Sequence, residues 1–332
     1  MTVGSLPRVA VAGVGYWGRN LARNFAELGS LAGVIDNFPA TANEVAAANG
    51  TVVLTLDEAL ADPSIDGIAI ATTAVTHFEV ARAALNAGKH VFVEKPLVLD
   101  ETDADELIAL AGDRGRLLMV GHLLRYHPVF RRMLELVRSG EFGPVRYIHS
   151  DRLSLGKVRT EEDVLWSFAP HDISMVLALA GEEPDTVTAQ GAAVLNPAIA
   201  DVATAQLGFP NGVKASIKAS WLHYRKVQQI VAVCDKATIV FEDSEADWNR
   251  KLAIHEHGFE MQQGAPVLSR GGHRYVEVPT DEPLKCECRH FLERMADGET
   301  PLTDGREGRA VLRVLRRATA DMAAAKSAGA RA

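Results

Sequence analysis

The sequence predicts an α/β protein in which a doubly wound parallel sheet is followed by an α+β domain with an open-faced, mainly antiparallel sheet. Strand-like and helix-like segments alternate up to about residue 121, as a parallel sheet with crossover helices requires. A Gly-x-Gly-x-x-Gly motif joins the first strand to the first helix. Beyond residue 121, segments such as Val213–Ser220 alternate apolar and polar residues, which is typical of a sheet with one covered face.

The N-terminal domain is expected to comprise residues 1–121. Its expected strands are Arg8–Ala12, Leu31–Ile35, Val52–Leu54, Gly67–Ala71, His90–Val93 and Leu117–Val120. The expected helices between them are Gly18–Leu28, Ala40–Asn49, Leu56–Ala61, Val75–Ala87 and Asp100–Gly112. Each segment has the length and periodicity of its class.

The second domain is expected to comprise residues 122–332, beginning with an amphipathic helix from Tyr126 to Val137. Its expected strands are Thr186–Leu195, Ala203–Phe209, Val213–Ser220, Val227–Val233, Ala237–Phe241 and Arg274–Val278. Helices are expected at Leu284–Met295 and Gly305–Ala325. An open sheet face tends to be covered by another molecule, so we expect a homodimer or homotetramer.

The glycine motif has the residue order that a dinucleotide requires. Gly13 allows a tight strand-to-helix turn, Gly15 lets the backbone approach a pyrophosphate, and Gly18 permits close packing of helix on strand. Tyr16 and Trp17 lie within the same loop. The helix that follows offers unpaired N–H groups to an anion, so these five residues are predicted to bind a cofactor in a Rossmann domain.

Asp36 selects among nicotinamide cofactors. It ends the second expected strand, where a carboxylate can accept hydrogen bonds from the adenosine ribose hydroxyls. A 2′-phosphate would be repelled, and neither Asn37 nor Phe38 supplies a compensating cation. NAD is therefore predicted over NADP, although a tight βα turn and an ordinary strand-end acid remain alternative interpretations.

Composition excludes several other classes. The 332 residues carry a net charge of -8 without a Lys/Arg block, which argues against a nucleic-acid partner. No apolar run approaches the ~18 residues of a membrane span, and no secretory signal is apparent. The three cysteines form no Cys-x-x-Cys pattern, and no cluster has metal-ligand spacing, so a cytoplasmic protein without a metal is expected.

A charged pair and a proline, Glu94-Lys95-Pro96, end the strand that begins at His90. Carboxyl ends of strands in a doubly wound sheet face the ligand, so Lys95 is predicted near the nicotinamide. Its ammonium can hold a substrate hydroxyl and stabilise a developing alkoxide. A Glu94–Lys95 surface pair is the alternative, and base rates favour a trans Lys95–Pro96 bond.

His171 is the predicted general base. Pro170 suits the first turn of a helix, which would place His171 at a helix N-terminus, where the dipole favours the neutral, proton-accepting imidazole. Asp172 follows, but adjacent helical side chains point about 100° apart, so the two are expected to serve different partners.

A basic stretch offers a further site. Arg152, Lys157 and Arg159 surround Gly156 and suit a diphosphate or a carboxylate. A solvated basic loop is the alternative interpretation.

Together, the glycine loop, Glu94-Lys95-Pro96 and Pro170-His171-Asp172 resemble the Gfo/Idh/MocA oxidoreductase family over essentially the whole chain. Gly121–Pro128, Arg152–Arg159 and Leu165-Trp166 are similar to its nucleotide-sugar branch, which includes enzymes that oxidise C3 of UDP-N-acetylglucosamine-type uronic acids. Ser167 departs from the family, which often has an acid at this position; its side chain is better suited to cap a helix.

The resemblance implies an NAD-dependent sugar dehydrogenase. Lys95 and His171 would be the catalytic pair beside the sugar carbon. The implied cofactor-lining residues include Thr72, Thr73, His77, Glu94 and Lys95, and the implied substrate-binding residues are Lys95, Tyr126, Arg152, Lys157, Arg159, His171 and Asp172. Two alternatives remain open, namely a dehydrogenase of a free polyol or aldose of the inositol type and a non-catalytic NAD-sensing regulator.

Overall fold

The computed structural model describes residues 6–156 and 158–329, which divide into two compact units. The first unit runs to Tyr126 and also includes Asp281–Leu312. The second comprises His127–Thr280 and the chain from Arg313 onward. The expected boundary between residues 121 and 122 therefore differs in two respects: the first unit continues to Tyr126, and a segment from the C-terminal part of the sequence returns to it.

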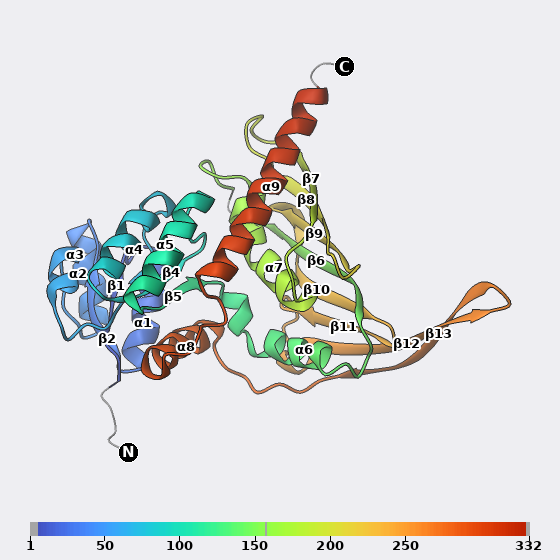
Figure 1. The fold of residues 1–332 in the computed structure, drawn as a ribbon, viewed down its shortest axis with the longest axis horizontal. Coiled ribbons are helices and arrows are strands. Elements are labelled where there is room, and N and C mark those ends of the chain that lie inside the picture. Colours follow the sequence, from blue (N-terminus) through green and yellow to red (C-terminus); the bar gives the residue numbers. More distant parts are fainter. Residues whose placement is uncertain (1–5, 157, 330–332) are drawn as a thin grey trace. The chain divides into compact units, whose positions relative to one another are not determined.

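The first unit is built on a five-stranded parallel sheet with the order β2-β1-β3-β4-β5 (Figure 1). Its strands are β1 (Val9–Ala12), β2 (Leu31–Ile35), β3 (Gly67–Ile70), β4 (His90–Glu94) and β5 (Leu118–Gly121). The helices that follow these strands are α1 (Gly18–Glu27), α2 (Pro39–Ala48), α3 (Leu56–Ala61), η1 (Ala74–Thr76), α4 (His77–Asn86), α5 (Glu101–Arg114) and η2 (Leu123–Tyr126). This is the predicted doubly wound sheet.

Burial explains which of the expected strands form. Every residue of β1 and of β3 is buried, because helices cover a parallel sheet on both faces. The expected strand Val52–Leu54 is wrong, since it is reduced to a single bridge between Val53 and Val34. Val52 and Val53 remain largely exposed, so no covering element stabilises further pairing there.

Helix α8 (Pro283–Asp297) is the segment that returns to the first unit. Its Phe291 ring lies 6.5 Å from the ring of Phe25 and 5.8 Å from that of Phe92, in edge-on geometry. Such aromatic pairs bury a large apolar area and add specific ring contacts. A helix far along the sequence therefore completes the core of the dinucleotide unit.

The second unit is built on an eight-stranded sheet with the order β13-β12-β11-β10-β6-β9-β8-β7. The strands are β6 (Val145–Leu155), β7 (Thr186–Ala192), β8 (Val202–Gly208), β9 (Lys214–Ser220), β10 (Leu222–Cys234), β11 (Ala237–Glu242), β12 (Leu252–Gln262) and β13 (Ala265–Tyr275). All neighbours pair antiparallel except β6 and β9. The remaining helices of the chain are α6 (Pro128–Arg138), α7 (Val164–Ala180), η3 (Trp248–Arg250) and α9 (Gly305–Gly329).

Helix α7 packs on one face of this sheet, against β6, β8 and β9 (Figure 1). On β9, Ala215, Ile217 and Ala219 are buried, whereas Lys214 and Lys218 are exposed. The predicted mainly antiparallel, open-faced sheet is therefore confirmed. Among the described residues, no helix combines the length and apolar character needed to cross a bilayer.

Parts of this sheet differ from the expectations. The Arg152–Arg159 stretch, for which a solvated loop was the alternative interpretation, begins inside β6, where Arg152 pairs with Gln228 of β10. The expected strand Arg274–Val278 is instead the end of β13, which stops at Tyr275. Strands β12 and β13 form a long hairpin, in which every residue of β13 is exposed. Without a covered face, this hairpin lacks the alternation that reveals a strand in sequence.

Candidate active site

The glycine-rich loop follows β1, and the structure gives each glycine a distinct steric reason. Gly13 has a φ of +83°, and a side chain there would meet the Ala71 carbonyl carbon at 2.7 Å. A side chain at Gly18 would overlap the Gly13 carbonyl oxygen at 1.8 Å. No atom lies within 4 Å of a side chain built at Gly15, so space is left for a ligand to approach the backbone.

Asp36, at the end of β2, faces this loop. Its Oδ2 accepts a hydrogen bond from the Val14 amide at 2.8 Å, and its Oδ1 accepts one from the Phe38 amide at 2.9 Å. Each carboxylate oxygen keeps further acceptor capacity for ribose hydroxyls. A cavity of about 530 Å³ opens here; it is lined by Ala12, Gly13, Gly15, Ile35, Asp36, Asn37, Phe38, Leu56, Ala71, Thr72, Thr73, Thr76 and Val80.

The cavity and its glycine loop fit the adenosine and pyrophosphate parts of NAD. The volume lies within the range of small-molecule sites, and its polar groups are few and convergent. Thr72 and Thr73 line the cavity, as the resemblance implied. Tyr16 and Trp17 are exposed in the loop, although neither lines the cavity.

His77 is buried and is not one of the residues that line the cavity. Its ring is buried, with Nδ1 2.8 Å from the Pro96 carbonyl oxygen and Nε2 3.2 Å from the Thr72 carbonyl oxygen. Burial lowers the pKa of His77, so the ring is neutral and donates one N–H. His77 therefore ties the Thr72 segment to the segment after Lys95.

Lys95 follows directly after β4 and is half-buried. Its peptide bond to Pro96 is cis, contrary to the base-rate expectation. The neighbouring Glu94 is buried, and its Oε1 accepts a hydrogen bond from the Trp17 indole Nε1 at 2.5 Å. Burial raises the pKa of Glu94 to about 7. The structure thus gives Glu94 a place inside the protein, in contact with the glycine-rich loop.

The predicted setting of His171 is wrong. Helix α7 begins at Val164, with Asp163 as its N-cap accepting from the Trp166 amide at 3.1 Å, and Pro170 lies in the helix interior. His171 is therefore mid-helix and half-buried, beyond the first turn where the dipole acts. Ser167 does not cap the helix either, because Asp163 already does so.

Asp172 serves a different partner from His171, as the helical geometry predicted. It is buried and forms an ion pair with the Arg152 guanidinium, and it accepts from the Ser150 hydroxyl at 2.6 Å. Arg152 is also largely buried in this pair. Both residues were expected to bind substrate, and the structure joins them in an ion pair where α7 packs on β6.

The other described residues that were predicted to bind substrate have different surroundings within their own units. Tyr126 is buried, and its hydroxyl lies 2.8 Å from Oγ1 of Thr303, so it belongs to the core of the first unit. Arg159 is exposed in the segment after β6. Lys157 lies outside the described residues. Of the two described cations of this stretch, Arg152 is held by Asp172.

Sequence reasoning missed one acidic residue, Glu287 of α8, which is fully buried. The sequence pattern contained a signal for this burial: Leu284, Cys288 and Phe291 mark the apolar face of the helix, and position 287 lies on that face.

Among the described residues, no group of three or more His, Cys, Asp or Glu side chains is arranged to hold a metal ion.

Comparison with known proteins defines the class. A family model described as an oxidoreductase family with an NAD-binding Rossmann fold matches residues 7–122, and the GFO/IDH/MocA C-terminal domain matches residues 130–240. The chain therefore belongs to the GFO/IDH/MocA family of oxidoreductases, and NAD is its cofactor.

Individual relatives are enzymes that act on sugars or cyclic polyols. The chain is 34% identical over 310 residues to UDP-N-acetylglucosamine 3-dehydrogenase of Acidithiobacillus ferrooxidans, covering 92% of this chain and 94% of that protein. A solved structure of that enzyme has a TM-score of 0.84 at 32% identity, with 96% and 97% of the two chains covered. Myo-inositol 2-dehydrogenase of Thermotoga maritima is 26% identical, with 77% of each protein covered.

Proposed function

We propose that this protein oxidises a secondary hydroxyl of a nucleotide-linked sugar, at C3, with NAD as the oxidant. The observation that carries the proposal is the likeness to a UDP-N-acetylglucosamine 3-dehydrogenase, because it extends over 92% of this chain and 94% of that enzyme. The substrate-determining second unit is thus included in the likeness. Asp36, whose carboxylate lines the cavity beside the glycine loop, supports NAD as the cofactor.

In this proposal His171 is the general base and Lys95 polarises the reacting oxygen. When bound, NAD accepts the hydride that leaves the sugar carbon. The imidazole of His171 takes the hydroxyl proton, and the C–O single bond of the alcohol becomes the C=O double bond of a ketone. The Lys95 ammonium stabilises the negative charge that develops on oxygen as the proton leaves. His171 then passes its proton to water.

The basic residues beyond β6 are proposed to favour a diphosphate-linked substrate. Arg159 is exposed and offers a cation, and Lys157 is a neighbour in sequence. Arg152 would contribute less to this role, since Nε and one terminal nitrogen of its guanidinium contact Asp172. Substrate recognition by charge would therefore depend on fewer cations than the sequence suggested.

The proposal is tested with purified protein, NAD and a panel of UDP-N-acetylglucosamine, its uronic acid, free N-acetylglucosamine and myo-inositol. We expect NADH formation with a nucleotide sugar and a loss of roughly 10²–10⁴-fold in kcat for His171→Ala, as for removal of a general base. Lys95→Met should also abolish most turnover. His255→Ala, at an exposed histidine of the same unit, serves as the control. Wild-type turnover in both catalytic variants would overturn the assignment.

A second candidate substrate is a free polyol. The observation that favours it is the 26% identity of this chain to the myo-inositol 2-dehydrogenase of Thermotoga maritima. The same panel distinguishes the two substrates. If only myo-inositol reduces NAD, and Arg159→Ala leaves its KM unchanged, the polyol is the substrate.

We further infer that the protein is a homodimer or homotetramer in the cytoplasm. The exposed edge strand β13 and the open face of its sheet support self-association, because an unpaired strand edge is a template for another chain. Three free thiols, Cys234, Cys286 and Cys288, suit a reducing compartment. Light scattering on the purified protein tests the assembly, and a monomeric mass at working concentration would contradict it.

A further inference from the structure

His77 is a buried histidine whose two ring nitrogens both face backbone carbonyl oxygens. It is the first residue of α4 and is 2% exposed. Nδ1 lies 2.8 Å from the carbonyl oxygen of Pro96, and Nε2 lies 3.2 Å from that of Thr72. These carbonyls belong to the segments that follow β4 and β3, which are neighbours in the parallel sheet. One side chain therefore contacts two segments at the carboxyl ends of the strands, where a doubly wound sheet binds its ligand.

The charge state of His77 limits it to one hydrogen bond with these carbonyls. Burial lowers the pKa of the ring, and a helix N-terminus also disfavours a positive charge, so the imidazole is neutral. A neutral imidazole has a single N–H donor, and its other nitrogen can only accept. The contact with Pro96 is the shorter of the two, so the proton is placed on Nδ1, which donates to that carbonyl oxygen.

The Thr72 segment has contacts of its own. A side chain built at Gly13 would lie 2.7 Å from the Thr72 amide nitrogen, so the glycine-rich loop packs directly on this segment. The Thr76 hydroxyl lies 2.7 Å from Oγ1 of Thr72 and 2.8 Å from the carbonyl oxygen of Thr73. All three threonines line the cavity. This wall of the cavity is thus held without a hydrogen bond from the histidine.

The segment after β4 carries the lysine proposed to polarise the reacting oxygen. Lys95 lies between Glu94, whose Oε1 accepts from the Trp17 indole, and Pro96, whose carbonyl oxygen accepts from His77. The two flanking residues are therefore each held by a different part of the first unit. Loss of the second hydrogen bond would release the backbone on one side of the lysine.

We propose that His77 is a positioning residue for Lys95: its Nδ1–H holds the carbonyl oxygen of Pro96 and so fixes the backbone from which the lysine ammonium reaches the reacting oxygen. The effect passes through one hydrogen bond and the adjoining peptide unit. The role of Lys95 here rests on the proposed function, whereas the hydrogen bond can be tested without any sugar. A histidine that does not line the cavity thereby acquires a function in the same site.

Two substitutions separate the two ring nitrogens. The side-chain nitrogen of asparagine lies close to the position of Nδ1, and that of glutamine lies close to the position of Nε2. His77→Asn therefore keeps an N–H donor for Pro96, whereas His77→Gln offers its donor to Thr72 instead.

The two variants are compared by kcat, with whichever sugar of the panel reduces NAD. We expect kcat of His77→Gln to fall by about 10- to 100-fold, because a small displacement of a catalytic group is costly in rate. His77→Asn should retain a kcat within about threefold of the wild-type value, since its donor keeps the lysine in place. The KM for the sugar should change little in either variant.

Two measurements on the full-length protein need no sugar. The amides of the buried residues Leu97 and Val98 should exchange hydrogen faster in His77→Gln than in the wild type, because a segment that loses an anchor opens more often. In His77→Asn they should exchange at the wild-type rate. Nitrogen-15 NMR of the wild-type protein should find the ring proton of His77 on Nδ1.

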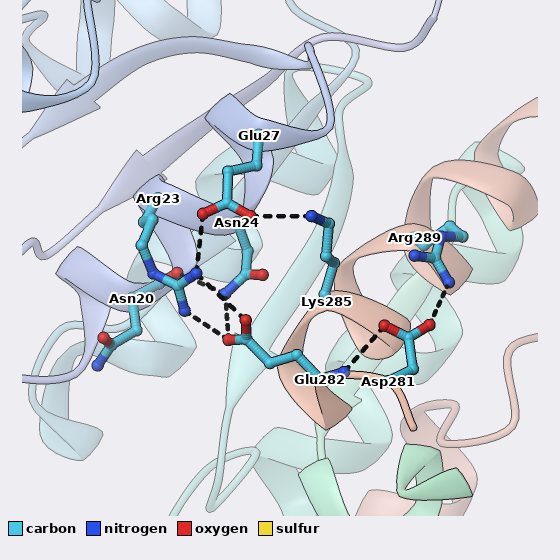
Figure 2. Close-up of polar contacts among 8 residues, drawn as sticks. All are labelled: Asn20, Arg23, Asn24, Glu27, Asp281, Glu282, Lys285 and Arg289. Carbon is cyan, nitrogen blue, oxygen red and sulfur yellow. Dashed lines mark hydrogen bonds and ion pairs between the residues drawn. The ribbon is translucent and has the colours of Figure 1, made fainter. Parts of the chain in front are cut away.

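A control variant breaks contacts elsewhere in the same unit. Figure 2 shows Arg23 and Glu27 of α1 facing Glu282 and Lys285 of α8. Arg23 pairs with both glutamates, and the Lys285 ammonium lies 2.9 Å from Glu27. These pairs are partly exposed and individually weak. Arg23→Gln should therefore change neither kcat nor hydrogen exchange in the segment after β4.

The ranking of the two His77 variants decides the outcome. Wild-type kcat in His77→Gln, equal impairment in His77→Asn and His77→Gln, or a ring proton on Nε2 would overturn the inference. Equal impairment would mean that the imidazole acts by packing alone. If no sugar reduces NAD, the proposed function fails, and hydrogen exchange and NMR decide whether His77 holds Pro96. The NMR measurement uses the wild-type protein, so it remains decisive where a variant fails to fold.

Discussion

The Asp36 side chain has two functions that a single substitution can separate. It accepts from the Val14 amide at 2.8 Å, and it presents the negative charge that would repel a 2′-phosphate. Asp36→Ser removes the charge while keeping a hydroxyl acceptor. We expect the Kd of NAD to rise roughly 10- to 100-fold, because a hydrogen bond to a charged group is worth about 1.5–3 kcal/mol. The Kd of NADP should fall, because the charge that repels a 2′-phosphate is removed.

Calorimetric titration with each cofactor measures this change in preference. Asp57→Ala, at an exposed acid of α3, is the matched control. An unchanged ratio of the two dissociation constants would mean that Asp36 does not select the cofactor.

Glu94 makes stability depend on pH. Burial raises its pKa from 4.5 to about 7, so between these values the folded state binds more protons than the unfolded state does. The contribution of Glu94 to the free energy of unfolding therefore falls as pH rises from about 4.5 to about 7, by roughly 3 kcal/mol.

Urea unfolding of the wild type and of Glu94→Gln at several pH values measures this contribution. The amide cannot ionise, so the difference between the two proteins should change across this pH range and level off above it. A constant difference from pH 4.5 to 7 would show that Glu94 ionises as it does in water.

At the same scale, the sequence predicted the local geometry of the candidate site better than its distant contacts. Gly13 and Gly18 are required by the turn itself, and Asp36 follows from its place at the end of a strand. Arg152 and Tyr126 were assigned to substrate because their partners, Asp172 and Thr303, lie far away in sequence. From the sequence alone, the guanidinium of Arg152 and the hydroxyl of Tyr126 could be assigned to substrate binding, because the side chains that contact them are brought close only by the fold.

At the scale of elements, a buried ion pair joins strand β6 to helix α7. Arg152 and Asp172 are both largely or fully buried, so removing one partner leaves an uncompensated charge. We expect Arg152→Met to lower the free energy of unfolding by about 3–5 kcal/mol.

The double variant Arg152→Met/Asp172→Asn should recover much of that loss, because no buried charge remains. Urea unfolding of the single and double variants measures the coupling. Equal loss in both would show that the arginine acts by packing alone.

The bounds of elements with a regular apolar pattern were predicted closely, whereas the bounds of elements with an irregular pattern were not. Strand β9 alternates cleanly and was predicted with bounds within one residue of Lys214–Ser220. Strand β6 carries the polar Ser150 and Arg152 on its inner side, because Asp172 is there to meet them, and this breaks the alternation. In α7 the proline suggested a helix start, whereas the Asp163 cap places the start at Val164.

At the scale of the whole molecule, the order of the two domains was predictable, but the return of α8 to the first unit was not. Phe291 contacts Phe92 and Phe25 across 199 and 266 residues of sequence, and no local sequence pattern predicts such contacts. The same return brings Glu287 into the unit that binds NAD. Long-range packing therefore decides which residues support the cofactor site.

The most direct test of the proposed activity follows one atom. UDP-N-acetylglucosamine carrying deuterium at C3 is incubated with the full-length protein and NAD, and the reduced cofactor is examined by mass spectrometry. If C3 is the carbon oxidised, the NADH carries the deuterium and the sugar product is a 3-ketone. Unlabelled NADH formed from this substrate, or NADH formed with myo-inositol alone, would contradict oxidation of a nucleotide sugar at C3.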